Sequence, residues 1–205
     1  MNNDVKFSMI KQIYTREEIP TYLKMFDLTD RICELGVAQG ENLKTMISHT
    51  FPNYVLALDA WSEEVCPHYK QKRHDASYAE VQKYCTYAEK WSGAKIDVIK
   101  GDHSLLVDNY EDESFDYIHI DSDHRYEQVK RDIEQWWPKV KMGGILSGHD
   151  YTSYSELYGV IQAVNEFVKD NKIKYFHVTI EQVKTWIILK AKPERRKLKG
   201  RLKGT

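Results

Sequence analysis

The sequence predicts an α/β fold: a Rossmann-like sheet of seven strands, mostly parallel, with helices on both faces. Short runs rich in β-branched and aromatic residues alternate with helical patterns, which is typical of a parallel sheet. The last two runs are separated only by residues 181–183. This connection is too short for a helical crossover, so we expect the last strand to be antiparallel.

The strands are predicted from β-rich runs bounded by polar or glycine-containing segments. They are expected at 31–36, 54–59, 95–101, 115–121, 144–150, 174–180 and 184–190. His119 alternates with Ile118 and Ile120, so we expect it inside the protein. Each of the first five strands brings an acidic residue toward its carboxyl end. Because ligands of open parallel sheets bind outside these ends, we expect the functional site there.

Five helices are predicted between the strands, at 14–26, 41–48, 77–91, 125–137 and 155–170. Thr15 is placed to cap the first helix, and Pro138 ends the fourth. Residues 62–94 form a longer connection than a simple crossover needs. We interpret the start of this insertion, residues 62–76, as a lid or as a wall of a substrate site.

The length of 205 residues fits one domain, which we expect to span 1–191. A hydrophobic fraction of 41% and a charged fraction of 30% are typical of globular proteins. The segment 192–205 contains seven of the 30 Lys and Arg residues and one acid. We expect this segment to be a disordered basic tail, and contact with nucleic acid is a less favoured alternative.

The sequence also indicates where the protein works. No apolar run is long enough to span a bilayer, and the first residues lack the apolar core of a signal peptide. Cys33, Cys66 and Cys85 are odd in number and lack the spacing of a disulfide framework. We therefore predict a soluble cytoplasmic protein without a membrane partner, and a homodimer is compatible with these observations.

The turn after the first strand, ELGVAQG (34–40), is the first candidate binding element. Its candidate residues are Glu34, Gly36, Val37 and Gly40, because glycines let a ligand approach the backbone and the following helix N-terminus favours anionic groups. A dinucleotide fingerprint would read G-x-G-x-x-G, but Ala38 occupies the position of its second glycine. The turn is therefore not predicted to hold a pyrophosphate.

The second and third strands end at Asp59 and near Asp102. Asp59 follows the glycine turn by about 20 residues, where an acid can accept both hydroxyl groups of a ribose. Four neighbours complete the candidate set: Ala60, Trp61, Gly101 and His103. The simpler alternatives make both acids helix caps and Trp61 a core residue. Ribose and base contacts without a phosphate cradle indicate a nucleoside cofactor.

The fourth and fifth strands end at Asp121, close to His124, and at His149 with Asp150. Neighbouring parallel strands lie about 4.8 Å apart, so Asp121 and Asp150 can reach one ion from two sides. His124 can instead take a proton directly as a general base. The simpler alternatives make Asp123 the N-cap of the next helix and let His149 and Asp150 begin another.

The stretch FDYIHIDSDHRYEQVKRDIEQWWPKVKMGGILSGHDY (115–151) resembles the signature of the methyltransferase domain 24 family. This family belongs to the class I S-adenosylmethionine-dependent methyltransferases, and its relatives include macrocin-type O-methyltransferases and cephalosporin hydroxylase-like proteins. The resemblance extends from about Arg31 to Lys190. It implies that the 34–40 turn binds the methionine and ribose portions of S-adenosylmethionine, that Asp59 holds the ribose, and that Asp102 lies by the adenine.

Several relatives hold a divalent cation with the acid that ends the fourth strand and an acidic pair that ends the fifth. Carried over by position, the resemblance implies Asp121, His149 and Asp150 as ligands of Mg²⁺ or another divalent cation. This sequence departs from the acidic pair at His149, and imidazole is a poorer ligand for Mg²⁺ than a carboxylate.

The combined interpretation is a methyltransferase that uses S-adenosylmethionine to methylate an oxygen of a small-molecule acceptor, such as a sugar or natural-product hydroxyl. Asp121, His124 and His149 are its candidate catalytic residues, and Asp121 is expected to face both cofactor and acceptor. One alternative is a nicotinamide-dependent oxidoreductase, for which the complete glycine fingerprint is missing. A second is a non-catalytic module of Rossmann fold that binds a cofactor or nucleic acid.

Overall fold

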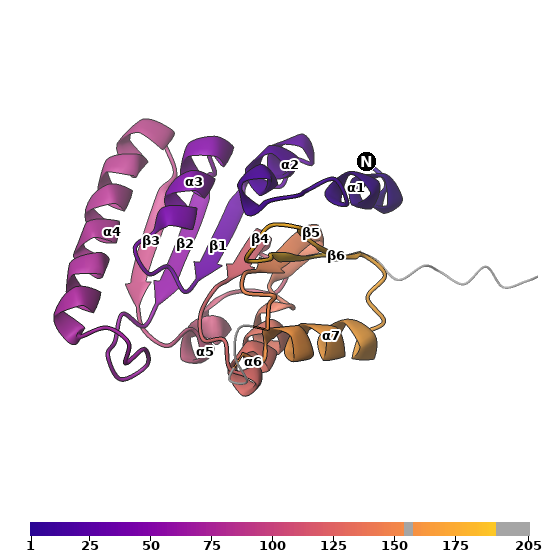
Figure 1. The fold of residues 1–205 in the computed structure, drawn as a ribbon. Helices are drawn as coiled ribbons and strands as arrows, with labels where there is room; N and C mark the ends of the chain where they lie inside the picture. The colour runs from indigo at the N-terminus through magenta and orange to yellow at the C-terminus, as the bar shows by residue number, and fades with distance from the viewer. Residues whose placement is uncertain (154–157, 192–205) are drawn as a thin grey trace, which may run out of the picture.

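A computed structural model of the protein describes residues 1–153 and 158–191, and it confirms the predicted fold class (Figure 1). The sheet has the strand order β3-β2-β1-β4-β5-β7-β6. Strands β1 to β5 run parallel, and β7 is antiparallel to both of its neighbours. The strands are β1 (Arg31–Leu35), β2 (Tyr54–Asp59), β3 (Lys95–Lys100), β4 (Phe115–Ile120), β5 (Val140–Gly148), β6 (Phe176–Val178) and β7 (Trp186–Leu189).

The helices form a layer on each face of the sheet, with α2, α3 and α4 on one side and α5, α6 and α7 on the other (Figure 1). They are α1 (Asn3–Ile10), α2 (Ile19–Met25), α3 (Glu41–Thr50), α4 (Gln71–Ser92), α5 (His103–Leu106), α6 (Tyr126–Trp136) and α7 (Val160–Asp170), with short 3₁₀ turns η1 (Arg16–Glu18) and η2 (Val107–Asn109). The predicted cap before η1 is present, because Thr15 and Glu18 form a capping box.

The central strands are buried on both faces, and their alternation divides the core into two clusters. Ile32 and Tyr117 pack in the cluster beneath α2, α3 and α4. Cys33 and Ile118 pack in the cluster beneath α6 and α7. Each fully buried aliphatic side chain contributes about 1.5–3 kcal/mol to folding, so both layers hold the sheet firmly. The same alternation places His119 inside the protein, fully buried, as predicted.

Several boundaries differ from the prediction. Helix α4 begins at Gln71, so the segment before it is shorter than 62–76. Helix α6 begins at Tyr126 with Arg125 at the N-cap, so the prediction that Asp123 caps it was wrong; the Asp123 carboxylate instead accepts from the Arg125 backbone N–H. No helix starts at His149 or Asp150.

One further difference lies near the N-terminus. Helix α1 was not predicted, because its apolar residues do not gather on one face strongly enough to signal a helix. The predicted start of α7 at 155–157 and the basic tail 192–205 lie outside the described residues. Within 1–153 and 158–191, no helix combines the length and the apolar character that crossing a membrane requires.

Candidate active site

The glycine turn after β1 lies directly against the end of β4. Gly36 has a φ of +83°, and a Cβ at this position would lie 2.1 Å from the Asp121 carbonyl oxygen. The backbone N–H of Asp121 donates to the Leu35 carbonyl oxygen at 2.7 Å. Only glycine allows both this backbone conformation and this approach. The predicted cofactor turn and the predicted catalytic strand end therefore touch.

Asp59 at the end of β2 organises the glycine turn. One carboxylate oxygen accepts from the backbone N–H groups of Val37 and Ala38, both at 2.8 Å. The other accepts from the backbone N–H of Trp61 at 2.6 Å. An ionised carboxylate has about four acceptor positions, so one remains for a hydroxyl group of a ligand. Asp59 therefore shapes the turn and keeps limited capacity for the ribose contact that the sequence predicted.

Trp61 lies beneath the same turn. Its indole N–H donates to the Ala38 carbonyl oxygen at 2.8 Å, and its ring packs against Tyr78 with centroids 4.8 Å apart. Only 1% of the residue is exposed. The structure thus places Trp61 in the core, which was the simpler of the two roles considered for it. Ala60 joins it to Asp59 and is half-buried.

Asp102 and His103 follow β3 at the same edge of the sheet, but their side chains contact different partners. Asp102 caps α5 by accepting from the Ser104 backbone N–H at 2.8 Å. His103 is buried and its Nε2 lies 2.8 Å from a carboxylate oxygen of Asp132 on α6. Burial lowers the pKa of His103, but the hydrogen bond and charge of Asp132 outweigh burial and raise it. The backbone N–H of Gly101 donates to the Asp59 carbonyl oxygen, which links β3 to β2.

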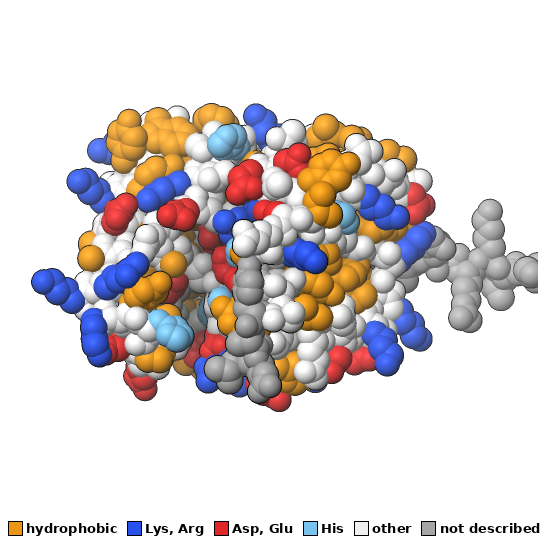
Figure 2. Space-filling view, viewed as in Figure 1, with side chains coloured by type: hydrophobic (Ala, Val, Ile, Leu, Met, Phe, Trp, Pro, Cys, Tyr) orange, Lys and Arg blue, Asp and Glu red, His pale blue; other side chains and the backbone are white. Residues whose placement is uncertain are grey.

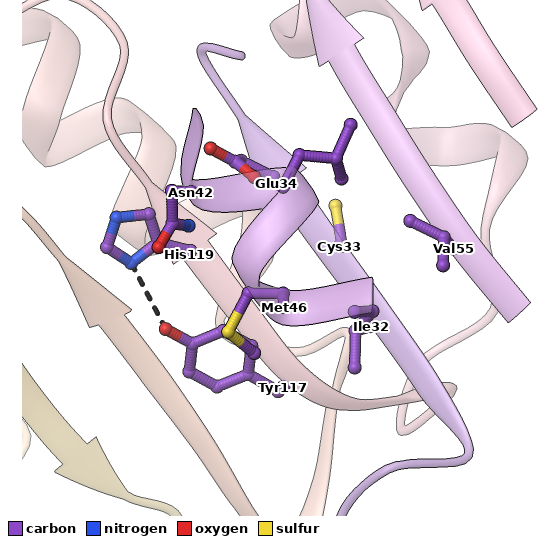
Figure 3. A pocket seen from close by; sticks show the side chains of 9 residues that line it. Ile32, Cys33, Glu34, Asn42, Met46, Val55, Tyr117 and His119 are labelled. Atoms are coloured by element: carbon purple, nitrogen blue, oxygen red, sulfur yellow. Dashed lines mark hydrogen bonds between the residues drawn. The ribbon is translucent and has the colours of Figure 1, made fainter. Parts of the chain in front are cut away.

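Unpaired polar atoms gather beneath the start of α3 (Figure 3). Glu34 on β1 is adjacent to His119 on β4 in the sheet register, and both side chains are buried. Among the described residues, Oε2 of Glu34, Nδ2 of Asn42 and Nε2 of His119 have no hydrogen-bond partner. Nδ1 of His119 is satisfied by Ser147 at 2.9 Å. Unpaired buried polar atoms are costly, and the space that these residues line has no room for a water molecule, so a ligand could supply the missing partners only if the start of α3 moved.

Glu34 and His119 are both expected to be uncharged at neutral pH. Burial, together with the nearby charge of Asp121, raises the pKa of Glu34 to about 8. Burial lowers the pKa of His119 to about 3. Asn42 was not identified as a site residue from the sequence. Its only indication there is its position at the start of the helix predicted at 41–48, which follows the glycine turn.

The ends of β4 and β5 bring together a cluster of acids and histidines. Nε2 of His124 lies 3.2 Å from a carboxylate oxygen of Asp150 and 3.6 Å from one of Asp121. Burial lowers the pKa of His124, but the two carboxylates outweigh burial and raise the pKa to about 9. Burial raises the pKa of Asp150, and its contacts with His124 and His149 lower it overall. The cluster therefore contains ion pairs at neutral pH.

Asp121, His124 and Asp150 can each place a ligand atom within 4.8 Å of the others. His149, which the family resemblance placed in this set, is not in the group; its Nδ1 pairs with Asp150 at 3.1 Å and lies 3.9 Å from Asp121. Two carboxylates and one imidazole fit a divalent transition-metal ion such as Mn²⁺ better than Mg²⁺, which prefers oxygen ligands. The donor set therefore fits a cation, with His124 as its nitrogen ligand.

Arg16, which lies near the N-terminus, also contributes to the site. Its guanidinium lies 3.6 Å from a carboxylate oxygen of Asp121, and its backbone N–H donates to the Glu181 side chain at 3.0 Å. A cavity of about 150 Å³ lies beside it, lined by Arg16, Glu17, Glu41, Asn42 and Thr45. Figure 2 shows acidic and histidine side chains near the middle of the face that is turned toward the viewer. No pattern in the sequence indicated that Arg16 would lie close to Asp121.

Solved structures share the architecture. They include the O-methyltransferase from Bacillus cereus in complex with S-adenosylhomocysteine, which is 14% identical, covers 91% of this chain and 88% of its own, and has a TM-score of 0.58. An S-adenosylmethionine-dependent O-methyltransferase from Thermotoga maritima is 12% identical over 93% of this chain and 72% of its own, with a TM-score of 0.57. Spermidine synthase from Thermotoga maritima is 13% identical over 87% and 59%, with a TM-score of 0.56. At these identities the likeness shows the fold alone.

Sequence comparisons identify the family. An uncharacterized protein of Sinorhizobium fredii, y4gI, is 26% identical over 137 residues, which are 64% of this chain and 14% of that much longer protein. A family model described as a methyltransferase domain, Methyltransf_24, matches residues 33–151, more than half of the chain. The matched region contains the glycine turn, Asp59 and the cluster of Asp121, His124 and Asp150. The chain therefore belongs to this methyltransferase domain family.

Proposed function

We propose that this protein methylates a hydroxyl oxygen of a small molecule. The observation that carries this proposal is the contact between Gly36 in the cofactor turn and Asp121 in the acid and histidine cluster. An acceptor bound at the cluster would lie beside a cofactor bound at the turn. Because methyl transfer is a displacement, placing the two reactants in contact supplies much of the rate enhancement.

The residues around the turn fit S-adenosylmethionine. The unpaired Oε2 of Glu34 and Nδ2 of Asn42 suit the polar amino-acid end of the cofactor. Asp59 keeps one acceptor position for a ribose hydroxyl. Asp102 uses its carboxylate to cap α5, so an adenine contact there would require sharing that carboxylate. These residues would hold the cofactor at its two polar ends.

In the proposed reaction the acceptor oxygen attacks the sulfonium methyl group. A carbon–oxygen bond forms, the carbon–sulfur bond breaks, and its electron pair stays on sulfur, which gives S-adenosylhomocysteine. The hydroxyl proton must leave, and the carboxylates of Asp121 and Asp150 are the candidate acceptors. Because its pKa is about 9, His124 carries a proton at neutral pH. In that protonated state it acts as a hydrogen-bond donor that orients the two carboxylates. Its predicted role as a base requires the neutral ring.

Asp121, His124 and Asp150 would also hold a divalent cation. Such a cation, when bound, lowers the pKa of a coordinated hydroxyl group. His149 would then act beside the site, because it hydrogen-bonds to Asp150 and can orient that carboxylate.

Binding and turnover measurements test the proposed function. Calorimetry is expected to show S-adenosylhomocysteine binding and no NAD binding. In a labelled methyl-transfer screen of sugars and phenols, Asp121→Asn is expected to lose at least 100-fold in turnover, because it weakens the acidic cluster, while it still binds S-adenosylhomocysteine. Asp123→Asn is the matched control, because Asp123 pairs with exposed Arg125 instead of the cluster. Absence of S-adenosylhomocysteine binding would contradict the cofactor assignment, and full activity of Asp121→Asn would contradict the catalytic one.

The metal is tested separately. Treatment with a chelator is expected to abolish turnover, and Mn²⁺ is expected to restore it at lower concentration than Mg²⁺ because His124 supplies a nitrogen ligand. Direct Mn²⁺ titration followed by electron paramagnetic resonance should show binding that Asp150→Asn weakens. Turnover that is indifferent to the chelator would remove the metal from the mechanism.

A further inference from the structure

Asp132 on α6 joins two loops of the candidate site, although neither its sequence position nor the family resemblance marks it. Its side chain is fully buried. One carboxylate oxygen accepts from Nε2 of His103 at 2.8 Å and from the Gln128 side chain at 2.9 Å. The other accepts from the Ser122 hydroxyl at 2.6 Å. A single buried carboxylate thus holds three donors.

Two of these donors come from strand ends and do not support the helix itself. His103 follows β3, where the loop carries Asp102. Ser122 follows β4 and is the residue directly after Asp121. Gln128 is the only donor of the three on α6. A carboxylate that served the helix alone would not need partners from two separate strand ends.

The Ser122 contact also reaches the cofactor turn. A Cβ on Gly36 would lie 2.7 Å from the Ser122 Cα, so the Ser122 backbone forms one wall of that turn. A small displacement of Ser122 would therefore move both Asp121 and the space available to the turn. His103 provides the second attachment through its 2.8 Å contact with Asp132, whose hydrogen bond and charge outweigh burial and raise the pKa of His103.

We propose that Asp132 is a positioning residue, which fixes the loop after β3 and the loop after β4 relative to each other. This inference rests on the proposed function, in which the first loop faces the cofactor and the second carries Asp121. Asp132 itself would touch neither cofactor nor acceptor. Its effect on both ligands is exerted through His103 and Ser122.

The test compares a substitution of Asp132 with substitutions of its two partners, Ser122 and His103. Asp132→Asn keeps the shape but removes the charge that His103 and Ser122 share. Ser122→Ala removes one hydroxyl donor, and His103→Asn shortens the side chain so that it no longer reaches Asp132. His103→Gln restores a donor near the position of Nε2 and serves as the rescue. Glu134→Gln is the matched control, because it removes an exposed carboxylate from the same helix.

Two measurements are made well below the melting temperature of each variant. In hydrogen exchange, Asp132→Asn is expected to accelerate exchange in both 101–105 and 121–125. Ser122→Ala is expected to affect only 121–125, and His103→Asn only 101–105. In calorimetry, Asp132→Asn is expected to weaken S-adenosylhomocysteine binding at least tenfold, His103→Gln is expected to bind it more tightly than His103→Asn does, and Glu134→Gln changes neither readout.

The outcomes separate this inference from the proposed function. Faster exchange along α6 alone, with S-adenosylhomocysteine binding within twofold of the parent, would show that Asp132 is only structural and would overturn the inference. Failure of the parent protein to bind S-adenosylhomocysteine would overturn the proposed function, and the exchange pattern would still decide whether Asp132 links the loops. If Asp132→Asn does not fold, the two partner variants decide: no loop-specific change in either one contradicts the inference.

Discussion

The two halves of the strand-end edge are built by different interactions. After β2 and β3, the acids hold backbone amides: Asp59 accepts from three of them and Asp102 from one. After β4 and β5, the acids face imidazoles, with His124 between Asp121 and Asp150. The first half is therefore held by hydrogen bonds to the main chain, and the second by ion pairs between side chains.

This difference shows how the two halves are prepared for their ligands. Backbone amides cannot rearrange without moving the chain, so the cofactor turn is fixed before a ligand arrives. Ion pairs between partly exposed side chains exchange partners more easily, which suits a cluster that must accept an acceptor or a cation. We expect changes in the first half to alter stability and cofactor binding together, and changes in the second to alter turnover more than stability.

The largest effect is expected where the two halves touch. Gly36→Ala would place a Cβ 2.1 Å from the Asp121 carbonyl oxygen at a φ of +83°. Left-handed strain and a clash with backbone together should lower the free energy of unfolding by about 4 kcal/mol or more. Urea denaturation followed by circular dichroism measures this loss.

Gly93→Ala is the control for that change. Gly93 also has a positive φ, +76°, but a Cβ there would meet no atom within 4 Å. Only the backbone strain remains, so a loss of about 1 kcal/mol is expected. Equal losses at Gly36 and Gly93 would mean that the contact between the two halves is not tight.

A smaller effect is expected at Asp59. Asp59→Ala would leave the backbone N–H groups of Val37, Ala38 and Trp61 without their acceptor. The free energy of unfolding should fall by roughly 3 kcal/mol, since hydrogen bonds to a charged acceptor are strong but not additive. S-adenosylhomocysteine binding, measured by calorimetry, should weaken at least tenfold.

Asp102→Ala provides the comparison within the same half. Asp102 accepts from only one backbone N–H, so its removal should cost about 1 kcal/mol, the usual value for a helix cap. If Asp59→Ala were no more destabilising than Asp102→Ala, the glycine turn would not depend on the Asp59 carboxylate.

Much of the fold and part of the site could be predicted from the sequence. The alternation of strand and helix patterns predicted the sheet, and the spacing of Gly36 and Asp59 predicted the cofactor edge because both depend on local order along the chain. The partners of these residues could not be predicted in the same way. The three backbone amides on Asp59 depend on how tightly the turn folds back over β2.

Contacts between segments that are far apart in the chain could not be predicted from the sequence. Arg16 lies 3.6 Å from Asp121 although the two residues are far apart in the sequence, and no periodicity indicates such a contact. Glu34 meets His119 through the register of β1 and β4, which a one-residue shift would change. His149 lies beside the two acids as the family resemblance implied, and the loop after β4 also brings His124 to them, which the resemblance did not imply.

A pH-dependent effect is expected at Glu34, which lies between the two halves and senses charges from both Asp121 and Asp59. Burial raises its pKa to about 8, so between about pH 4.5 and pH 8 the folded state holds a proton that the unfolded chain has released. Stability from this group is therefore lost as the pH rises through that window. Glu34→Gln removes the titration, and its gain in stability over the parent protein should grow with pH to roughly 4 kcal/mol at pH 8. Urea denaturation at several pH values measures the difference in stability between the two proteins. Contributions of other titrating groups such as His119 cancel in this difference.

Glu41→Gln, an exposed change at the start of α3, is the control and should give no such trend. A constant difference between pH 5 and pH 8 would show that Glu34 is ionised in the folded protein, and the boundary between the two halves would then be charged.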